Sequence, residues 1–507
     1  MTESVTETPP ELQGPFPTKG STTTHLLELP QGSCSYKAIA EWMVLRKIYK
    51  PIGYLFHTAY FVESSHGAAR PLTFVFNGGP GAASAYLHMG ALGPKRVKFG
   101  PMGTLPNPPI SVVDNLESWL PFTDLVFIDP IGTGLSRSLK EPKKEETPQA
   151  SAASQASPQC ESEETTEFWE VDRDLDGLGE FIQRFLSKHH RWTSPLFLAG
   201  ESYGGFRVAK MARRLQERHG VGLSGALLIS PAIELEALLG SDYDLTYWVE
   251  LFPSQVAAAY HHGRIADLPK DHSLISILQQ AEAFAKNELV RWLTQGEALP
   301  AREQAKTSAT MARLLGLPKQ LVERSGGRIS STVFCRELLR DKRRLCGHYD
   351  ASITTVDPFP NRDGYEGPDP TLASIDRLYT GAINYQLRTQ LELETDLDYR
   401  LLSREVSKGW KDQSRDHLVK KPSGAMDDLR YGMSLNEHMK VFIAHGYFDL
   451  VTPYFGSHRL IELMKLTKEQ RKNLFTCNFQ GGHMFYTWDE SRSAFFSETQ
   501  SFYRSAS

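Results

Sequence analysis

A serine flanked by glycines is the first feature of this sequence that is able to do chemistry. It stands in the segment G-E-S-Y-G-G at residues 200–205, which follows the apolar residues 196–199 and precedes a helical pattern. A G-x-S-x-G motif between a strand and a helix forms a tight turn that exposes the serine hydroxyl, and Gly200 and Gly204 let its two arms approach. The motif alone is common in ordinary turns. Because a strand and a helix flank it here, we predict that Ser202 is a nucleophile.

A serine hydroxyl needs a base within hydrogen-bond reach and a carboxylate that orients the base. Two late apolar runs lead into such residues: residues 440–444 precede Asp449, and residues 473–479 precede His483. In α/β-hydrolases the chain order is serine, acid and histidine, each after a strand. We therefore predict a catalytic triad of Ser202, Asp449 and His483.

Two other residues are alternatives for the base and the acid. His445 directly follows the apolar run 440–444, and Asp129 ends another apolar run that begins at residue 124. Both rank lower because of chain order: His445 precedes the late aspartate, and Asp129 precedes the serine.

A loop rich in glycine supplies a further element of this chemistry. The segment N-G-G-P-G at residues 77–81 directly follows the apolar run 72–76. It lacks the Lys-Ser/Thr pair of a phosphate-binding loop, so we do not expect nucleotide binding. Glycines let a backbone N–H approach a reacting atom, as in the loop after the third strand of α/β-hydrolases.

The elements that must hold these residues alternate along the chain. Strand and helix patterns follow one another up to residue 230, which predicts a doubly wound, mostly parallel sheet of the α/β-hydrolase type. Residues 36–45 and 54–62 predict an antiparallel pair at the sheet edge. Between about 234 and 357 the pattern is helical, with stripes at 274–293, 305–315 and 333–345.

The chain therefore divides into a core and an insertion. We expect the helical insertion to cover the carboxyl edge of the sheet, exclude water and shape a cleft. The predicted organisation is a disordered tail at 1–29, a core at 30–232 with a low-complexity loop at 140–164, a helical cap at 233–371 and the second part of the core at 372–507.

Composition sets the remaining limits. With 507 residues, a net charge of -4 and a pI near 6.5, the chain has no electrostatic footprint for nucleic acid or an anionic membrane. Its five scattered cysteines argue against a disulfide framework or a C-x-x-C metal site. We see no signal peptide, no apolar run long enough to span a bilayer and no glycosylation sequon. We expect a cytoplasmic protein, or a periplasmic or secreted one if a leader was removed.

The motifs together resemble those of the serine carboxypeptidases, the family that includes cathepsin A and carboxypeptidase Y. The resemblance runs from about residue 30 to the end. It rests on N-G-G-P-G at 77–81, D-P-I-G-T-G at 129–134, G-E-S-Y-G-G at 200–205, G-Y-F-D at 446–449 and G-G-H-M at 481–484. In its alanine-for-cysteine loop and its closing segment, the chain is most similar to the bacterial branch.

This resemblance implies an α/β-hydrolase fold and the hydrolysis of C-terminal peptide bonds, with no metal or organic cofactor. The implied partner is a peptide with a free C-terminus; oligomeric state is open. The implied roles are Ser202 as nucleophile, His483 as general base and then acid, Asp449 as the orienting carboxylate, Gly79 and Tyr203 as backbone donors of an oxyanion hole, and Asn77 and Glu201 as ligands of the substrate carboxylate.

One position departs from the family pattern. A glutamate normally stands two residues before the Gly-Pro that follows the glycine loop, and Ala91 stands there in this chain. Two neighbouring carboxyl groups raise one another's pKa and can donate hydrogen bonds to a substrate carboxylate. Without the partner, either Glu201 acts alone or a cation such as Lys95 or Arg96 assists. The alternative for these two cations is a solvated basic turn.

Two other classes of function remain open from the sequence. The same triad can pass the acyl group to an alcohol or amine, or hydrolyse esters and amides, because fold and triad do not dictate the acceptor. The chain can also be a binding protein on a hydrolase scaffold, which the intact triad argues against.

Overall fold

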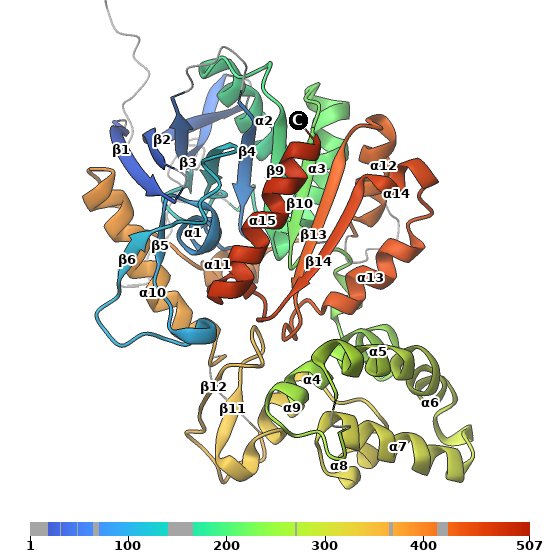
Figure 1. The fold of residues 1–507 in the computed structure, drawn as a ribbon. Helices are drawn as coiled ribbons and strands as arrows, with labels where there is room; N and C mark the ends of the chain where they lie inside the picture. Colours follow the sequence, from blue (N-terminus) through green and yellow to red (C-terminus); the bar gives the residue numbers. More distant parts are fainter. Residues whose placement is uncertain are drawn as a thin grey trace, which may run out of the picture.

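A computed structural model describes residues 19–30, 32–47, 49–63, 70–139, 166–268, 271–364, 369–412 and 424–506. A ten-stranded sheet forms its centre, in the order β1-β2-β3-β7-β4-β9-β10-β13-β14 with β8 paired to β3 (Figure 1). Within the run β7-β4-β9-β10-β13-β14, each strand is parallel to the next, whereas β7 is antiparallel to β3. The α/β-hydrolase fold predicted from the sequence is confirmed.

The chain crosses from one side of the sheet to the other at β4. Its neighbour on one side is β7, which comes next among the central strands, and its neighbour on the other side is β9. In open α/β sheets, such a reversal leaves a crevice at the carboxyl ends of the strands, where ligands bind. The loop at 77–81 follows β4 and Ser202 follows β9, so the predicted chemistry gathers at this crevice.

The strands have the following bounds: β1 Ser21–Leu29, β2 Gly32–Lys47, β3 Lys50–Val62, β4 Leu72–Phe76, β5 Lys95–Val97, β6 Val112–Asp114, β7 Asp124–Ile128, β8 Arg137–Ser138, β9 Leu196–Glu201, β10 Gly225–Ile229, β11 Arg344–Cys346, β12 Thr354–Val356, β13 Lys440–Gly446 and β14 Leu474–Phe479. The predicted antiparallel pair is confirmed, because β2 and β3 pair from Tyr36 opposite Val62. The pair does not form the edge, because β1 lies outside β2.

The predicted disordered tail is wrong for its last part. Residues Ser21–Leu29 form β1, whose side chains alternate between exposed and less exposed positions and which pairs with β2 along its whole length. Three consecutive threonines favour a strand, and pairing with a long neighbour satisfies their backbone groups. Residues 1–18 and the predicted loop at 140–164 lie outside the described residues.

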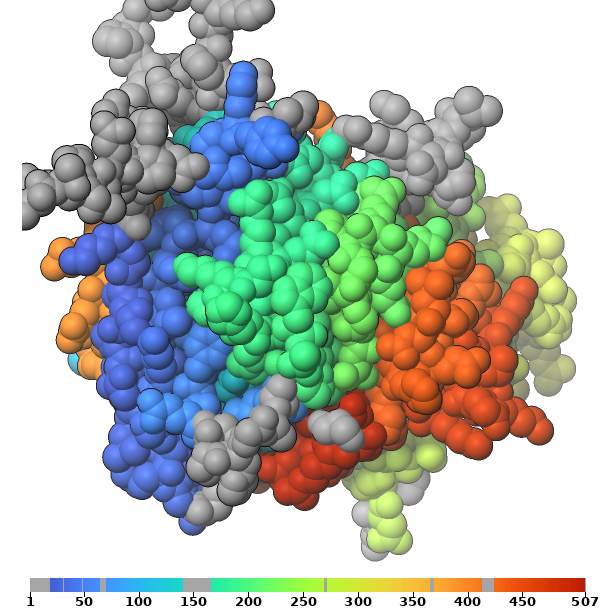
Figure 2. Space-filling model, turned by 90° about the horizontal axis from the view of Figure 1, so that it is seen from above, coloured from blue at the N-terminus to red at the C-terminus, as the bar shows by residue number. Residues whose placement is uncertain are grey.

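Helices cover both faces of the sheet. One apolar cluster packs α2, α3 and α12 against it, and another packs α1, α10 and α15 on the opposite face. Seen from above, α2 and α3 lie in order between the N-terminal strands, in blue, and the C-terminal segments, in orange (Figure 2). The bounds of the helices that flank the sheet are α1 Ala85–Leu87, α2 Val171–Lys188, α3 Tyr203–His219, α10 Leu372–Tyr385, α11 Arg404–Gly409, α12 Met426–Leu435, α13 Tyr454–Leu463, α14 Lys468–Lys472 and α15 Asp489–Ala506.

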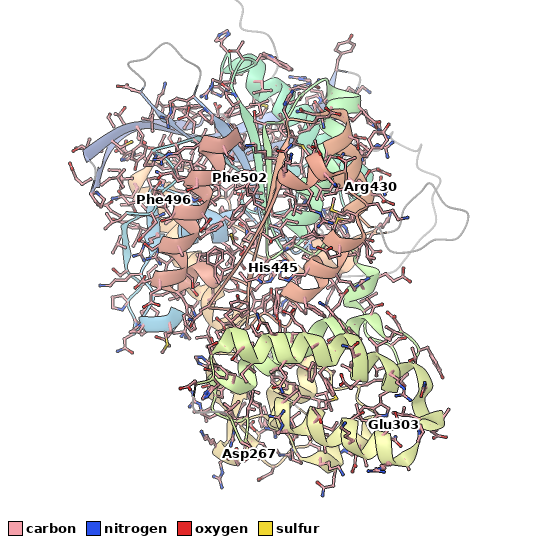
Figure 3. All side chains as sticks on the ribbon, turned by 45° about the vertical axis from the view of Figure 1, so that its right-hand side comes forward. Asp267, Glu303, Arg430, His445, Phe496 and Phe502 are labelled. Carbon is pink, nitrogen blue, oxygen red and sulfur yellow. The ribbon has the colours of Figure 1, made fainter. Side chains whose placement is uncertain are left out.

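The segment predicted as a cap forms a layer below the sheet. Figure 3 labels Asp267 and Glu303 in this layer and Phe496 and Phe502 on α15. Its helices are α4 Thr246–His261, α5 Leu274–Phe284, α6 Val290–Gln295, α7 Ala301–Leu315, α8 Lys319–Arg324 and α9 Ser331–Glu337. The helix expected over 333–345 is wrong in its second half, because the chain turns into the hairpin of β11 and β12.

The helical layer shares its apolar core with the sheet domain. Its buried cluster includes Phe448, Tyr454, Phe455 and Trp488, which come from the chain after β13 and β14. The layer therefore packs on the loops at the carboxyl edge of the sheet. None of the helices in the described ranges has the length and apolarity needed to cross a membrane.

Candidate active site

Ser202 stands on a strained turn between β9 and α3. Its backbone has φ 60° and ψ -124°, a combination that a residue with a side chain rarely adopts. A Cβ atom on Gly200 would lie 2.1 Å from the carbonyl oxygen of Gly204, and one on Gly205 would lie 2.4 Å from Pro231. Only glycine fits these positions, and the close approach of the two arms predicted from the motif is present.

Asp449 and His483 meet at the ends of β13 and β14. The Nδ1 atom of His483 lies 2.7 Å from Oδ2 of Asp449. The other carboxylate oxygen accepts hydrogen bonds from the backbone N–H groups of Val451 at 2.8 Å and Thr452 at 3.0 Å. Burial alone would lower the pKa of His483, but the carboxylates of Asp449 and Glu201 outweigh it and raise that pKa. The arrangement fixes which ring nitrogen faces the aspartate.

Thr452 is a member of this network that sequence reasoning missed. Its hydroxyl lies 2.7 Å from Oδ2 of Asp449, 3.1 Å from Nδ1 of His483 and 2.9 Å from the carbonyl oxygen of Ser230. The Ser230 hydroxyl in turn donates to the carbonyl oxygen of His483 at 2.8 Å. The one sequence signal was an aspartate followed three residues later by threonine, a pattern typical of many turns.

Ser202, His483 and the glycine loop line one pocket of about 60 Å³. A space of this size holds a small group or a few water molecules. The pocket joins residues more than 400 positions apart in the chain. Its lining consists of Asn77, Gly78, Gly79, Ala82, Tyr86, Glu201, Ser202, Tyr349, Leu372, Leu402, His483 and Met484.

The glycine loop lies directly against the serine turn. A Cβ atom on Gly78 would lie 2.5 Å from the backbone nitrogen of Tyr203 and 2.7 Å from Cβ of Ser202. Gly79 adopts φ +98°, which favours glycine. Tyr203 is the first residue of α3, so its N–H has no acceptor within that helix. The predicted oxyanion donors thus come from two segments in close contact.

Asn77 and Glu201 form a buried pair at the floor of the pocket. The side-chain amide of Asn77 donates to Oε2 of Glu201, and its oxygen accepts from the backbone N–H of Leu87 at 3.0 Å. The second contact fixes the orientation of the amide. Burial raises the pKa of Glu201 to about 7, and the nearby His483 only partly offsets this. Glu201 therefore exchanges its proton near neutral pH.

Tyr486 is the partner of Glu201 that the sequence did not reveal. Its hydroxyl donates to Oε1 of Glu201 at 2.8 Å. Ala91 is buried, and its carbonyl oxygen accepts from Asn115 at 2.7 Å. A Cβ atom on the adjacent Gly90 would lie 2.7 Å from the ring of Tyr486, so aromatic side chains fill this wall. The family pattern places a second acid beside this glutamate. In this chain the phenol group of Tyr486 holds the carboxyl group of Glu201.

The hypothesis that Lys95 or Arg96 assists the site is wrong in its geometry. The ammonium group of Lys95 forms an ion pair with Asp114. The guanidinium group of Arg96 lies 4.0 Å from Asp489. Neither side chain lines the pocket that contains Ser202. Ion pairing of two partly buried side chains describes this turn better than substrate binding.

The two alternative residues also lie outside the pocket. Nε2 of His445 lies 2.8 Å from the Ser457 hydroxyl, and burial lowers the pKa of His445 to about 3. Oδ1 of Asp129 accepts from the backbone N–H of Ser84 at 3.0 Å, and burial raises the pKa of Asp129 to about 6. Both residues serve the packing of the loops around the site.

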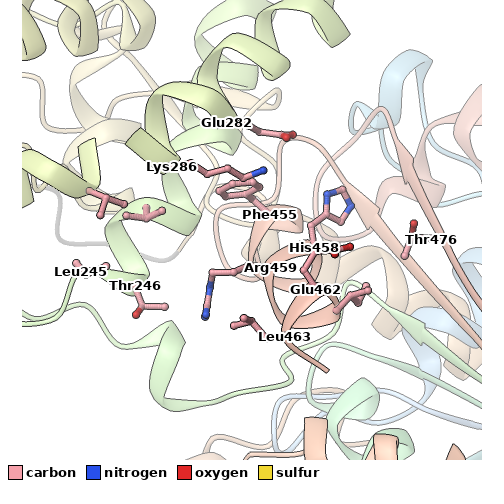
Figure 4. Close-up of a pocket in the computed structure, with 13 residues that line it drawn as sticks. Leu245, Thr246, Glu282, Lys286, Phe455, His458, Arg459, Glu462, Leu463 and Thr476 are labelled. Atoms are coloured by element: carbon pink, nitrogen blue, oxygen red, sulfur yellow. The ribbon is translucent and has the colours of Figure 1, made fainter. Parts of the chain in front are cut away.

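A larger pocket of about 650 Å³ lies between the helical layer and α13 (Figure 4). Its charged side chains already have partners. Nε of Arg459 lies 2.5 Å from Oε1 of Glu250, and the Tyr454 hydroxyl donates to Glu282 at 2.9 Å. No member of the predicted triad lines it. Size alone therefore does not identify the candidate site in this molecule.

Comparison with known proteins finds similarity in the part of the chain that contains the glycine loop and the serine turn. Residues 53–294 match the family model of the serine carboxypeptidases. This range contains the glycine loop and the serine turn, whereas Asp449 and His483 lie beyond it.

Two curated relatives match shorter segments. Serine carboxypeptidase-like 13 of Arabidopsis thaliana is 28% identical over 193 residues, 37% of this chain and 38% of that protein. The pheromone-processing carboxypeptidase KEX1 of Verticillium alfalfae is 28% identical over 160 residues, 31% of this chain and 20% of that protein. The chain thus spans less than two fifths of these relatives' length. Both relatives come from eukaryotes, so the similarity to a bacterial branch stays a prediction.

Among solved structures, feruloyl esterase B of Aspergillus oryzae aligns with 91% of this chain and 78% of its own, at 13% identity and a TM-score of 0.36. A likeness at this level adds nothing about function.

Proposed function

We propose that this chain, whose residues 53–294 match the serine carboxypeptidase family, hydrolyses C-terminal peptide bonds through an acyl-enzyme. The observation that carries the proposal is the buried pair of Asn77 and Glu201, which lines the same pocket as Ser202 and His483. A hydrolase of esters or amides needs the serine and the histidine but has no use for a buried acid beside them. An enzyme that binds a free C-terminal carboxylate does need such an acid, because the protonated acid donates a hydrogen bond to that carboxylate.

In this proposal His483 removes the proton from the Ser202 hydroxyl, and the serine oxygen attacks the scissile carbonyl carbon. The backbone N–H groups of Gly79 and Tyr203 donate to the oxygen that becomes negative. His483 then gives its proton to the leaving amine. Water attacks the resulting ester with His483 again as base, which releases the acid and restores the serine. Asp449 orients the imidazole ring and stabilises its charged form. No metal or organic cofactor takes part in these steps.

Glu201 and Asn77 provide the preference for a free carboxylate. A protonated Glu201 donates a hydrogen bond to the substrate carboxylate, whereas an ionised one repels it. Because the pKa of Glu201 is about 7, the protonated form predominates throughout the weakly acidic range, up to about pH 7. His483 must be neutral to act as a base, and its pKa is raised. We therefore expect a bell-shaped pH profile whose two limbs belong to this coupled pair.

The test is mass spectrometry of a mixed peptide set incubated with the wild type and with Ser202→Ala between pH 4 and pH 9. Stepwise loss of C-terminal residues in the wild type alone supports the proposal. Internal cleavage, or transfer of the acyl group to an added alcohol or amine in place of water, favours the alternative functions of the same triad. Failure of folded wild type to react with a fluorophosphonate probe at Ser202 favours a binding protein.

A further inference from the structure

Three side chains that bind transition metals well meet away from the active site. Glu41 lies on β2 and His57 lies directly opposite it on β3, so both side chains stand on one face of the sheet. His189 follows the last turn of α2, which packs on that face. Their ligand atoms all lie within 4.8 Å of one another. His57 is fully buried, whereas Glu41 and His189 reach the surface.

The distances in this cluster fit a metal better than hydrogen bonds. Nε2 of His57 lies 3.4 Å from Oε1 of Glu41, and Nε2 of His189 lies 3.7 Å from the same oxygen. These separations exceed those of good N–H···O hydrogen bonds. Within the described part of the chain, neither ring nitrogen of His57, nor Nε2 of His189, has a partner with hydrogen-bond geometry. In a tetrahedral zinc site with bonds near 2.05 Å, neighbouring ligand atoms are roughly 3.3 Å apart.

Aromatic rings hold the two imidazoles in place. The ring of His57 packs on Phe181 at 5.0 Å and on Phe185 at 5.4 Å between centroids. The ring of His189 lies 4.3 Å from that of Phe185. Rings fixed in this way keep their nitrogens directed at Glu41 without a metal, which lowers the cost of organising the site.

Lys188 is the competing cation. Its ammonium group lies 2.7 Å from both carboxylate oxygens of Glu41. The side chain is about half exposed, so it is able to turn into solvent. A divalent ion on Glu41 would repel this ammonium group.

We propose that Glu41, His57 and His189 bind one Zn²⁺ ion, with the fourth position open to water, and that the ion displaces Lys188 from Glu41. Two imidazoles and one carboxylate are a ligand set that zinc prefers. The ion would join β2, β3 and the end of α2. The site is independent of the proposed carboxypeptidase activity.

The experiment uses the full chain freed of metal with a chelator and titrated with ZnCl₂ against a chromophoric zinc indicator. The variants are His189→Asn, Glu41→Gln and Lys188→Met, with His219→Asn as a matched control because His219 is a half-buried histidine outside the cluster. We expect one site in the wild type, at least about 100-fold weaker binding in His189→Asn and Glu41→Gln, tighter binding in Lys188→Met and no change in His219→Asn.

Spectroscopy of the Co²⁺ form gives a second readout that does not depend on affinity. We expect the intense visible bands of a tetrahedral Co²⁺ site in the wild type and in Lys188→Met, and their loss in His189→Asn. Circular dichroism of each metal-free variant checks that it is folded. The proposal is overturned if the folded His189→Asn and Glu41→Gln variants bind Zn²⁺ as the wild type does, or if Lys188→Met binds it more weakly.

Discussion

At the scale of residues, the proposed specificity depends on what surrounds the carboxyl group of Glu201. Asn77 and Tyr486 each donate a hydrogen bond to it, and burial raises its pKa to about 7. Both donors favour the ionised form, whereas burial favours the protonated form. Because these two effects oppose each other, we expect a small change in either donor to shift the pKa of Glu201 and therefore the pH dependence of activity.

Replacement of Tyr486 by phenylalanine tests this balance. The variant loses a hydrogen bond that lowers the pKa of Glu201, so that pKa should rise by about 0.5 to 1 unit, the equivalent of about 1 kcal/mol. We expect the alkaline limb of kcat/KM for free-acid peptides to move upward by this amount, with little change for ester substrates. Tyr379→Phe is the matched control, because Tyr379 is buried nearby and its hydroxyl has no hydrogen-bond partner among the residues that the structure describes. An unmoved limb in Tyr486→Phe would remove Tyr486 from the account.

Thr452 is a positioning residue for the aspartate and the histidine. Thr452→Val keeps the shape of the side chain but removes the hydroxyl, whose one proton is within reach of two acceptors, Oδ2 of Asp449 and the carbonyl oxygen of Ser230. We expect kcat to fall about 10-fold for all substrates, because one to two hydrogen bonds contribute about 1 to 1.5 kcal/mol. KM should stay within about twofold of the wild-type value. Thr452→Ser should restore kcat, and a loss that serine fails to rescue would point to packing instead.

At the scale of elements, we expect the contact between the loop after β4 and the turn after β9 to govern the proposed oxyanion site. Gly78→Ala would place a methyl group 2.5 Å from the backbone nitrogen of Tyr203. The loop must then move away, and we expect kcat to fall by about 100-fold or more, the effect of losing one oxyanion donor. Gly222→Ala is the control, since no atom of the described residues lies within 4 Å of its added methyl group. Equal activity of the two variants would place the oxyanion donors elsewhere.

The sequence predicted these two elements because their motifs are local. The serine turn and the glycine loop each require small residues within a few positions, and each follows an apolar run that forms a buried strand. The alternation of such runs with helical patterns predicted the mostly parallel sheet. Residues 344–346 and 354–356 were missed because three-residue strands have no periodicity to detect. Strand β1 was missed because its stability comes from pairing with β2.

Tyr486 and Thr452 were missed for a different reason. Their partners, Glu201 in one case and Ser230 in the other, lie 285 and 222 positions away in the chain. No spacing in one sequence predicts such a contact. The alternatives for Lys95 and Arg96 stayed open in the sequence for the same reason, since nothing local revealed that Asp114 and Asp489 pair with them.

At the scale of the whole molecule, the buried site carries a cost in stability that depends on pH. The pKa of Glu201 is about 7 in the folded chain, against about 4.3 when exposed. The folded chain therefore binds more protons between these values, and its stability falls as pH rises through this window. Above pH 7 the loss is on the order of 4 kcal/mol.

The variant Glu201→Gln cannot ionise, so it should escape this loss. We expect its Tm to exceed that of the wild type by several degrees at pH 8, and the difference to shrink towards pH 4. Glu236→Gln serves as the control because Glu236 is exposed. A Tm difference that does not change with pH would mean that Glu201 is not held near neutrality by burial.

The fold brings the pieces of the proposed chemistry to one edge of one sheet. Asn77, Ser202, Asp449 and His483 follow four different parallel strands, and the helical layer packs on the loops beyond them. We propose that this edge of the sheet recognises the free C-terminus of a peptide.

The most direct test is kcat/KM for matched peptides that differ only in a free-acid or amidated C-terminus, measured at pH 6 in the wild type and in Glu201→Gln. We predict at least a 10-fold preference for the free acid in the wild type and a smaller preference in the variant, because Asn77 and the protonated Glu201 both donate to the carboxylate. Equal values for the two peptides in the wild type would contradict the assignment as a carboxypeptidase.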